Sequence, residues 1–368
     1  MGALKILNAD RLPELALWIQ MWSFQPAQEI FAHPKFVKLF CRPADTALCA
    51  YMELSGGVLM FPFILRPLPV EKWAGEHCQS QDIISPYGYG GLVYSGSNAA
   101  NCLSENNVRT FWREFDAWSR NNKIVSCFIR FSPYSCYIQA FSGRVEPLGE
   151  HVIRLLSPGL PEIWNDFDHK VRTNIRRALR TGLEVEIDPG SNRLEEFKKI
   201  YYATMDRHHA QPQYYFPEEF FSAIRQDLPG KHIYFHTLQE NKVISTELVL
   251  ISQDYLYSFL GGTDKNALKL YPNEILKEAV IRWGIEHGKK AYALGGGYKG
   301  QDSLFHYKKS LAPRGIVSAM VGKKIYDETA YQTLCEMRLK YEIALGNTID
   351  FTDEFFPAYR NCATAQRQ

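Results

Sequence analysis

The chain has 368 residues, of which 46% are hydrophobic, enough for about two domains with sizeable cores. Its 42 Lys and Arg residues nearly balance its 40 Asp and Glu residues, and the resulting net charge of +2 excludes a basic coat that would hold nucleic acid along the whole chain. Any basic site is therefore expected to be a local cluster.

The cysteines and the apolar runs indicate an intracellular protein. The eight cysteines form no C-x-x-C pair and no zinc spacing, so we expect reduced core residues and no metal site. The longest apolar runs, such as residues 58–65, have the length of a strand and fall below the ~20 residues of a membrane-spanning helix. The start shows no signal-peptide pattern, and we expect a cytoplasmic location. The oligomeric state stays open.

In chain order, the first half predicts two strands joined by a Gly-rich turn, then a helix and a buried strand, over residues 47–54, 58–66, 107–121 and 123–131. The second half predicts three strands, a helix and a further strand, over residues 232–239, 242–252, 255–262, 272–287 and 290–294. The β-β-α-β order therefore occurs twice. We predict an α/β fold of mixed sheets in two similar domains, residues 1–150 and 151–368, joined near the Pro- and Gly-rich segment 147–161.

A loop over residues 82–91 places Tyr87 and Tyr89 among three glycines and a proline. Glycines allow a ligand to approach the backbone closely, and the tyrosines can stack or donate hydrogen bonds. A purely structural turn explains the pattern equally well. We take Tyr87 and Tyr89 as candidate substrate-binding residues, and Lys38 as a third candidate from the first half.

A basic helix is predicted over residues 170–180, with its apolar positions on one face. Arg172, Arg176 and Arg180 lie four residues apart on the other side, a spacing that suits fork-shaped contacts with phosphates. A solvated helix face is an equally good interpretation. Arg172, Asn174 and Arg176 are the candidate substrate-binding residues of this helix.

Glu247 lies in the otherwise mostly apolar run 243–251. A carboxylate that loses its hydration favours its neutral form and can serve as a general base, so Glu247 is a candidate catalytic residue. Alternation along the strand also allows Ser245 and Glu247 to share a solvated face of the sheet.

The segment 294–311 combines a strand end, a glycine turn and a lysine pair. Gly295, Gly297 and Gly300 fit the dinucleotide fingerprint G-x-G-x-x-G. The context does not fit, because a short helix over residues 302–311 follows and the acidic residue expected about 20 positions on is absent. The turn suits the binding of an anionic acyl donor instead.

The helix after this turn carries the main catalytic candidate, Lys308, which can stabilise negative charge as an amine attacks a carbonyl. Tyr307 and Ser303 are candidate substrate-binding residues. In the alternative interpretation Lys308 points to solvent and Lys309 is interchangeable with it. No motif pairs a nucleophile with a base, so direct transfer between two bound substrates is expected.

Four segments resemble the tandem-domain acyltransferases of the Fem family: residues 82–92, residues 170–185, the helix that ends at Gly288, and residues 294–311. The best matches are Lys170-x-Arg172-x-Asn174-Ile175-x-x-Ala178-x-x-x-Gly182, similar to the charged helix of the family, and Tyr307-Lys308-Lys309-Ser310-Leu311, similar to its terminal aromatic-Lys segment. The resemblance spans most of the chain and implies two tandem GNAT-like acyltransferase domains.

The resemblance also implies an activity, since the best-known members transfer amino acids from aminoacyl-tRNA to the stem-peptide amine of a peptidoglycan precursor. It assigns Lys308 to the lysine near the reacting carbonyl, and the helix of Arg172 and Arg176 to the basic start of the second domain. The partners that it implies are a phosphate-bearing or lipid-linked acceptor and tRNA as the carrier of the donor group.

The loop over residues 85–91 departs from the bridge-forming members and is similar to relatives associated with polysaccharide or other surface polymers, so an amino-sugar acceptor is an alternative. The coenzyme A loop Q/R-x-x-G-x-G/A is not found, which weakens acyl-CoA as the donor without excluding it. No tightly bound cofactor is expected. A non-catalytic binding module of the same fold is the remaining alternative.

Overall fold

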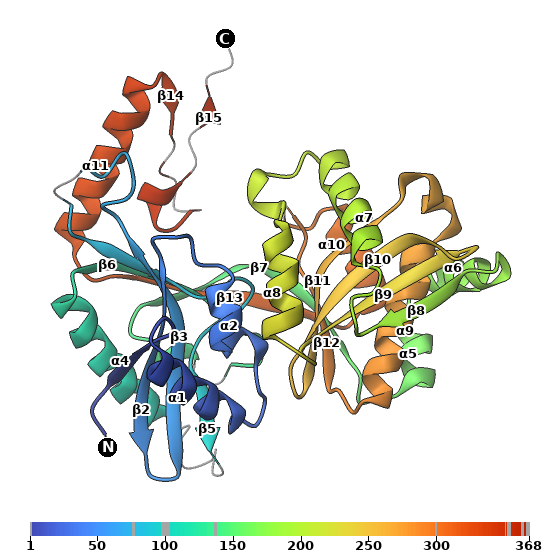
Figure 1. Cartoon of the computed structure of the whole chain (residues 1–368), viewed down its shortest axis with the longest axis horizontal. Helices are drawn as coiled ribbons and strands as arrows, with labels where there is room; N and C mark the ends of the chain where they lie inside the picture. The colour runs from blue at the N-terminus through green and yellow to red at the C-terminus, as the bar shows by residue number, and fades with distance from the viewer. Residues whose placement is uncertain are drawn as a thin grey trace. The chain divides into compact units, whose positions relative to one another are not determined.

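The computed structural model describes residues 2–75, 78–96, 104–135, 138–298, 300–349, 351, 355–361 and 364–365 (Figure 1). The chain divides into two compact units. Unit 1 comprises Met1–Leu148 and Ala319–Gln368, and unit 2 comprises Gly149–Ser318. The sequence prediction had placed the C-terminal 50 or so residues in the second domain, whereas the structure groups them with the first part of the chain.

The sheet of unit 1 has the strand order β1-β2-β3-β4-β6-β13, with β5 paired to β3. Its strands are β1 (Lys5–Asn8), β2 (Thr46–Leu54), β3 (Gly57–Pro67), β4 (Gln81–Ile84), β5 (Val93–Gly96), β6 (Ile124–Arg130) and β13 (Ile316–Ile325). β4 and β6 run parallel, and the other pairs are antiparallel. The pairing of β13 with β6 brings the C-terminal part of the chain, red in Figure 1, to the N-terminal strands.

The helices of unit 1 are α1 (Leu12–Ser23), α2 (Pro34–Lys38), α4 (Glu105–Asn121) and α11 (Glu328–Ala344), with short 3-10 turns at Ile30–Ala32, Ile138–Ala140 and Ala358–Arg360. A short ribbon of β14 (Asn347–Thr348) and β15 (Thr364–Ala365) follows α11. The Ser104 side chain caps α4 by accepting a hydrogen bond from Asn107 N. Phe111, Trp112 and Phe115 of α4 belong to the core cluster that also contains residues of β2, β3 and β6.

The sheet of unit 2 has the strand order β7-β12-β11-β10-β9-β8. Its strands are β7 (Arg144–Leu155), β8 (Glu184–Asp188), β9 (His232–Gln239), β10 (Lys242–Ile251), β11 (Tyr255–Thr263) and β12 (Ala291–Gly295). Its helices are α5 (Leu160–Asp166), α6 (His169–Arg180), α7 (Leu194–Arg207), α8 (Glu218–Asp227), α9 (Pro272–Glu286) and α10 (Ser303–Leu311), with 3-10 turns at Pro212–Tyr214 and Lys265–Leu270.

Helices cover both faces of the β9–β10 hairpin. Ile233 and Phe235 of β9 pack in the core cluster that α6 and α9 share. Tyr234, which points to the other face because side chains alternate along a strand, packs against Phe197 of α7 with ring centroids 4.9 Å apart. The alternative interpretation that Glu247 lies on a solvated face of the sheet is therefore wrong, because Glu247 is buried.

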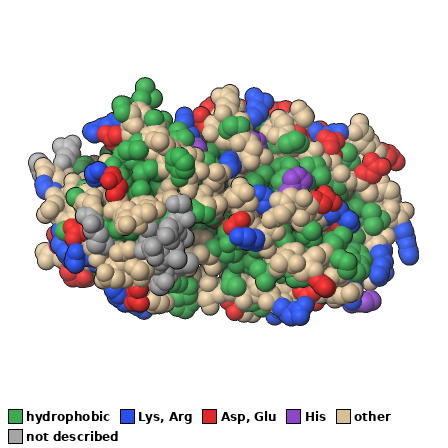
Figure 2. All heavy atoms as spheres, turned by 90° about the horizontal axis from the view of Figure 1, so that it is seen from below, with side chains coloured by type: hydrophobic (Ala, Val, Ile, Leu, Met, Phe, Trp, Pro, Cys, Tyr) green, Lys and Arg blue, Asp and Glu red, His purple; other side chains and the backbone are tan. Residues whose placement is uncertain are grey.

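Charged side chains of both signs are scattered over the face of the molecule seen in Figure 2, and the described residues of that face form no continuous basic area. Over the described residues, no helix is long and apolar enough to cross a membrane. No group of three or more potential metal ligands occurs in the same described part of the chain.

Candidate functional site

The glycine turn and α10 hold Lys308 in unit 2. Asp302 caps α10 by accepting a hydrogen bond from Phe305 N, and its other oxygen accepts from Tyr298 N at 2.8 Å, which ties the turn to the helix. Lys308 lies on the second turn of α10, and its Nζ donates to the carbonyl oxygen of Gly296 at 2.6 Å. The ammonium group is thus held against the turn and does not extend freely into solvent.

The environment of Lys308 lowers the pKa of its ammonium group. Burial, reinforced by the nearby charge of Lys277, lowers the pKa of Lys308 to about 8, while Glu247 and Asp302 act in the opposite direction. The side chain is therefore largely cationic at pH 7 but titrates close to neutrality. A cation with little solvent around it suits a place where negative charge develops during a reaction.

A buried ion pair contributes the second part of the site. Lys277 of α9 donates from Nζ to Glu247 Oε1 of β10 at 2.7 Å, and also to Ser258 Oγ of β11 at 2.9 Å. The hydroxyl of Tyr292, on β12, donates to the same Glu247 oxygen. Lys277 and Tyr292 thus both hold Oε1 of the carboxylate, and Ser258 holds the lysine. The other oxygen, Oε2, is buried and has no hydrogen-bond partner among the described residues.

Two tyrosines of this region carry neutral hydroxyl groups. Burial first, and then the charge of Glu247, raises the pKa of Tyr292 well above its usual value. Burial, followed by the charges of Glu274 and Glu247, does the same for the pKa of Tyr307. The Tyr307 hydroxyl is buried and has no hydrogen-bond partner in the part of the chain that the structure describes. With Glu247 Oε2, it offers one donor and one acceptor that a bound substrate can satisfy.

His151, at the start of unit 2, adds a titratable group that the sequence interpretation missed. An added Cβ on Gly296 would lie 3.1 Å from His151 Cδ2, so the imidazole lies against the same glycine whose carbonyl accepts from Lys308. Burial, together with the charge of Lys308, lowers the pKa of His151 to about 4. The ring is neutral at pH 7 and can accept a proton.

The basic helix α6 is in part structural. Arg172 Nη1 donates to the carbonyl oxygens of Asn165 at 2.7 Å and of Phe167 at 2.6 Å, and so caps the C-terminal end of α5. The guanidinium group of Arg176 lies over the Trp164 ring, 5.4 Å from its centroid. Phosphate binding by Arg172 and Arg176 stays a prediction.

The other predicted residues are distributed over both units. Asn174 is buried and donates to Glu274 Oε1 at 2.9 Å, which links α6 to α9, while Ser303 is exposed on the first turn of α10. In unit 1, Lys38 forms an exposed ion pair with Asp10 at 2.6 Å.

The two tyrosines of the glycine-rich loop also belong to unit 1 and differ from each other. Tyr87 stacks on Phe40 with ring centroids 4.8 Å apart and is 38% exposed. Tyr89 is buried edge-on against Phe31, and burial raises its pKa. Only Tyr87 therefore presents a substantial part of its ring to solvent.

The sequence contained one signal for the missed ion pair. Helix α9 buries residues around most of its circumference, among them Leu276, Val280 and Ile281. A lysine inside such a helix is expected to need a buried carboxylate, because lysine is almost never fully buried unless it is paired. Glu247, in a mostly apolar strand, was the acid that could have been matched with this lysine. Nothing in the sequence around His151 pointed to a role for it.

Comparison with known proteins assigns the domain that holds Lys308, Glu247 and Lys277. Residues 166–309 match the family model described as acetyltransferase (GNAT) domain. This segment is a GNAT acetyltransferase domain. The buried ion pair and the Lys308 contact therefore belong to a GNAT domain, and His151 lies just before the matched segment.

The GNAT-domain chain is distantly related to FemX-type alanyltransferases. It is 26% identical over 175 residues to the UDP-N-acetylmuramoylpentapeptide-lysine N(6)-alanyltransferase of Weissella viridescens. That match covers 46% of this chain and 50% of the relative, so it spans about half the length of that enzyme.

Two solved structures share the fold over most of the GNAT-domain chain. The crystal structure of FemX superposes with a TM-score of 0.64 at 13% identity and covers 87% of this chain and 98% of its own. The structure of L-PGS from Bacillus licheniformis reaches a TM-score of 0.53 at 13% identity and covers 89% and 96%. The predicted mixed α/β fold of the tandem GNAT type is confirmed.

Proposed function

We propose that the protein is an N-acyltransferase of the Fem type that transfers an aminoacyl or acyl group to an amine of a cell-wall or surface-polymer precursor. The observation that carries the proposal is the partly buried Lys308 ammonium of a GNAT domain, which is held at the carbonyl of Gly296. The distant relationship to an alanyltransferase supports the reaction class.

In the proposed reaction the acceptor amine attacks the carbonyl carbon of the donor directly, without a covalent enzyme intermediate. The electron pair of the carbonyl moves onto its oxygen, where the Lys308 cation stabilises the developing negative charge. The C–N bond forms, the electron pair on the oxygen then re-forms the carbonyl, and the bond to the leaving oxygen or sulfur breaks. The amine loses a proton, and the leaving group gains one to depart as a hydroxyl or thiol. Glu247 and the neutral imidazole of His151 are the two groups of the site that can accept this proton.

The donor in this proposal is aminoacyl-tRNA, with acyl-CoA as the alternative. The alanyltransferase relative favours the first, and the acetyltransferase family description favours the second. The acceptor is a phosphate-bearing or lipid-linked amine, with an amino sugar as the alternative, and Arg172 and Arg176 are its proposed phosphate contacts. A cytoplasmic location and the absence of a tightly bound cofactor are part of the same proposal.

The decisive experiment incubates the purified protein with alanyl-tRNA or an acyl-CoA and a panel of amine acceptors, and detects products by mass spectrometry. One new acyl-amine product identifies the donor and the reaction class. If no product forms with either donor, the alternative of a non-catalytic GNAT-like binding module is favoured.

Matched lysine variants test the assignment of Lys308 once a product is known. Lys308→Met is expected to lower kcat by roughly 10²–10³, the usual effect of losing one donor to an oxyanion, with a smaller change in KM. Lys309→Met is the control, because among the described residues the contact with the carbonyl of Gly296 is made by Lys308 and not by Lys309. Equal small effects of both substitutions would remove Lys308 from the mechanism.

A further inference from the structure

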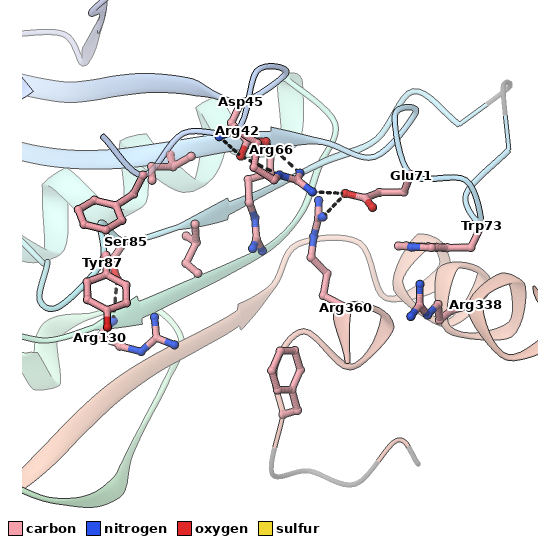
Figure 3. A pocket seen from close by; sticks show the side chains of 14 residues that line it. Arg42, Asp45, Arg66, Glu71, Trp73, Ser85, Tyr87, Arg130, Arg338 and Arg360 are labelled. Carbon is pink, nitrogen blue, oxygen red and sulfur yellow. Dashed lines mark hydrogen bonds and ion pairs between the residues drawn. The ribbon is translucent and has the colours of Figure 1, made fainter. Parts of the chain in front are cut away.

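A second polar site lies wholly within unit 1. It is a pocket of about 390 Å³ whose described lining includes five arginines: Arg42, Arg66, Arg130, Arg338 and Arg360. Only two lining residues are acidic, Asp45 and Glu71. In Figure 3, Tyr87 and Trp73 lie at opposite ends of this group, and dashed lines join Glu71 to both Arg42 and Arg360.

Two of the arginines share one buried carboxylate. Arg66 donates from Nε to Asp82 Oδ1 at 2.6 Å, and Arg360 donates from Nε to Asp82 Oδ2 at 2.7 Å. The Asp82 side chain is fully buried. Because Arg66 comes from β3 and Arg360 from the 3-10 turn near the C-terminus, Asp82 fixes two guanidinium groups from distant parts of the chain.

Each of these guanidinium groups keeps one nitrogen without a partner. Nη2 of Arg66 and Nη2 of Arg360 are both buried and donate no hydrogen bond to any described residue, and the two side chains are only 15% and 10% exposed. A buried N–H group of a charged side chain that lacks a partner is unfavourable, because it has lost its hydration and gained no hydrogen bond in return. Such groups in a native protein require an explanation, and a bound acceptor is the simplest.

The neighbouring acids do not supply that acceptor. Arg42 occupies both oxygens of Asp45, at 3.0 and 2.9 Å. Glu71 Oε1 receives hydrogen bonds from both Arg42 and Arg360 through their Nη1 atoms. The two Nη2 atoms thus stay without an acceptor, and their side chains line a pocket whose described lining holds more positive than negative groups.

Aromatic rings complete the pocket. Tyr87 stacks on Phe40, and both line the pocket. Trp73 lines it as well, with the guanidinium of Arg338 over its ring at 5.6 Å from the centroid. The combination of arginines with aromatic and aliphatic walls suits an oxyanion attached to a ring, and the volume lies in the range of ~300–1,000 Å³ of small-molecule sites.

We propose that this pocket binds a small organic oxyanion, a phosphate or a carboxylate carried on a ring-sized group, which accepts hydrogen bonds from Nη2 of Arg66 and Arg360. Binding requires unit 1 alone and does not rest on the proposed acyl transfer. The same loop that the sequence marked through Tyr87 then serves as one wall of this anion site.

The test is isothermal titration calorimetry of the full-length protein with phenyl phosphate, benzoate, inorganic phosphate and neutral benzyl alcohol. We expect saturable binding of phenyl phosphate or benzoate, with an affinity at least tenfold above that of benzyl alcohol, and the stronger of the two identifies the type of oxyanion. Failure of both to saturate at millimolar concentration, or equal binding of benzyl alcohol, overturns the proposal. Equally tight binding of inorganic phosphate overturns the requirement for a ring.

The variants keep the charge beside Asp82 so that the protein folds. Arg66→Lys and Arg360→Lys lose the Nη2 donor and are each expected to weaken binding at least tenfold, whereas Arg113→Lys, at an exposed position of unit 1, is the unchanged control. Tyr87→Leu, at a partly exposed position, is expected to weaken binding several-fold.

Unaltered affinity in all three pocket variants would contradict the proposed anion site. Lys308→Met is expected to bind normally, which separates this result from any failure of the acyl transfer.

Discussion

At the scale of single residues, Lys308 carries a positive charge in a place with little access to solvent. Its ammonium donates to a backbone carbonyl and contacts no carboxylate of the described residues at hydrogen-bond distance, while Lys277 is paired with the nearby Glu247. This arrangement explains why the pKa of Lys308 falls to about 8. If a group that titrates so close to neutral pH takes part in the reaction, the reaction rate changes with pH in the same range.

The pH dependence of kcat is the first prediction. If the charged form of Lys308 stabilises the oxyanion, kcat falls as the pH rises through about 8, because the ammonium deprotonates there. The measurement is a pH–rate profile of the wild-type enzyme beside Lys308→Met, in which this limb should be absent. A wild-type rate that rises through pH 8 would instead identify neutral Lys308 as a base.

The buried pair of Glu247 and Lys277 supports a second prediction, on stability. Lys277→Met leaves the Glu247 charge buried without its main partner, and we expect the free energy of unfolding to fall by roughly 3–5 kcal/mol. The double variant Glu247→Leu with Lys277→Met removes both charges and should regain much of the loss. Urea denaturation followed by circular dichroism measures all three proteins.

The control for this pair is the exposed ion pair of Lys5 with Glu53, whose side chains are 53% and 57% exposed. Lys5→Met should leave the free energy of unfolding nearly unchanged, as is usual for surface pairs. A similar small effect of Lys277→Met would contradict the structural role of the buried pair and leave Glu247 free for catalysis alone.

The sequence predicted single residues of the site but not their partners. Glu247 was proposed because it is a carboxylate in a mostly apolar run, and Lys308 because it follows the glycine turn and matches the aromatic-Lys segment of the Fem family. Lys277 and Tyr292 were not, because they lie 30 and 45 positions from Glu247 and meet it only through the folding of the sheet. Periodicity identifies a buried position but does not name the residue across from it.

At the scale of elements, α6 shows how one arginine can serve the fold. The hydrogen bonds of Arg172 satisfy carbonyl groups at the end of α5, where a helix lacks internal partners. Arg176, one turn on, is exposed and contacts the ring of Trp164. The same basic stripe thus contains one capping residue and one surface residue.

This difference gives the third prediction. Arg172→Ala is expected to lower the free energy of unfolding by about 1.5–3 kcal/mol, the range for hydrogen bonds of a charged group, and Arg176→Ala by less than about 1 kcal/mol. Urea denaturation without substrate separates this effect from phosphate binding. Equal stabilities of the two variants would show that the cap contributes nothing.

Most elements with clear local signals were predicted well. The strands expected over residues 47–54 and 58–66 are β2 and β3, and the helix expected over residues 272–287 is α9, which Gly288 ends with a φ of +66°. These segments carry their own turn and cap residues. Leu179, expected on the apolar face of α6, is instead 56% exposed, because the buried face is narrower than the pattern suggested.

At the scale of the whole molecule, the C-terminal segment departs most from expectation. β13 pairs with β6, Lys324 forms an ion pair with Asp116, and Arg360 binds Asp82. The last of these contacts joins residues 278 positions apart. Such long-range pairing leaves no local trace in the sequence, and the division at the Pro- and Gly-rich segment 147–161 therefore assigned these residues to the second domain.

A fourth prediction follows for truncated chains. A protein that ends at residue 318 loses β13 and the Arg360 contact, so unit 1 is expected to be unstable and prone to aggregation through the uncovered edge of β6. The excised fragment 149–318 keeps the core cluster of unit 2 and should unfold cooperatively. Circular dichroism and size-exclusion chromatography test both, and a soluble, folded 1–318 chain with an intact unit 1 would contradict the prediction.

The discontinuity of unit 1 also sets an order of events on the ribosome. Asp116 and its partner Lys324 are 208 positions apart, so the first unit to be started is the last to be finished. At roughly 5–20 residues per second, the hydrophobic strands of unit 1 wait on the order of 10–40 seconds for β13, while unit 2 can complete in the interval. We therefore expect the nascent chain to depend on holding chaperones during this delay, a demand that arises from the path of the chain alone.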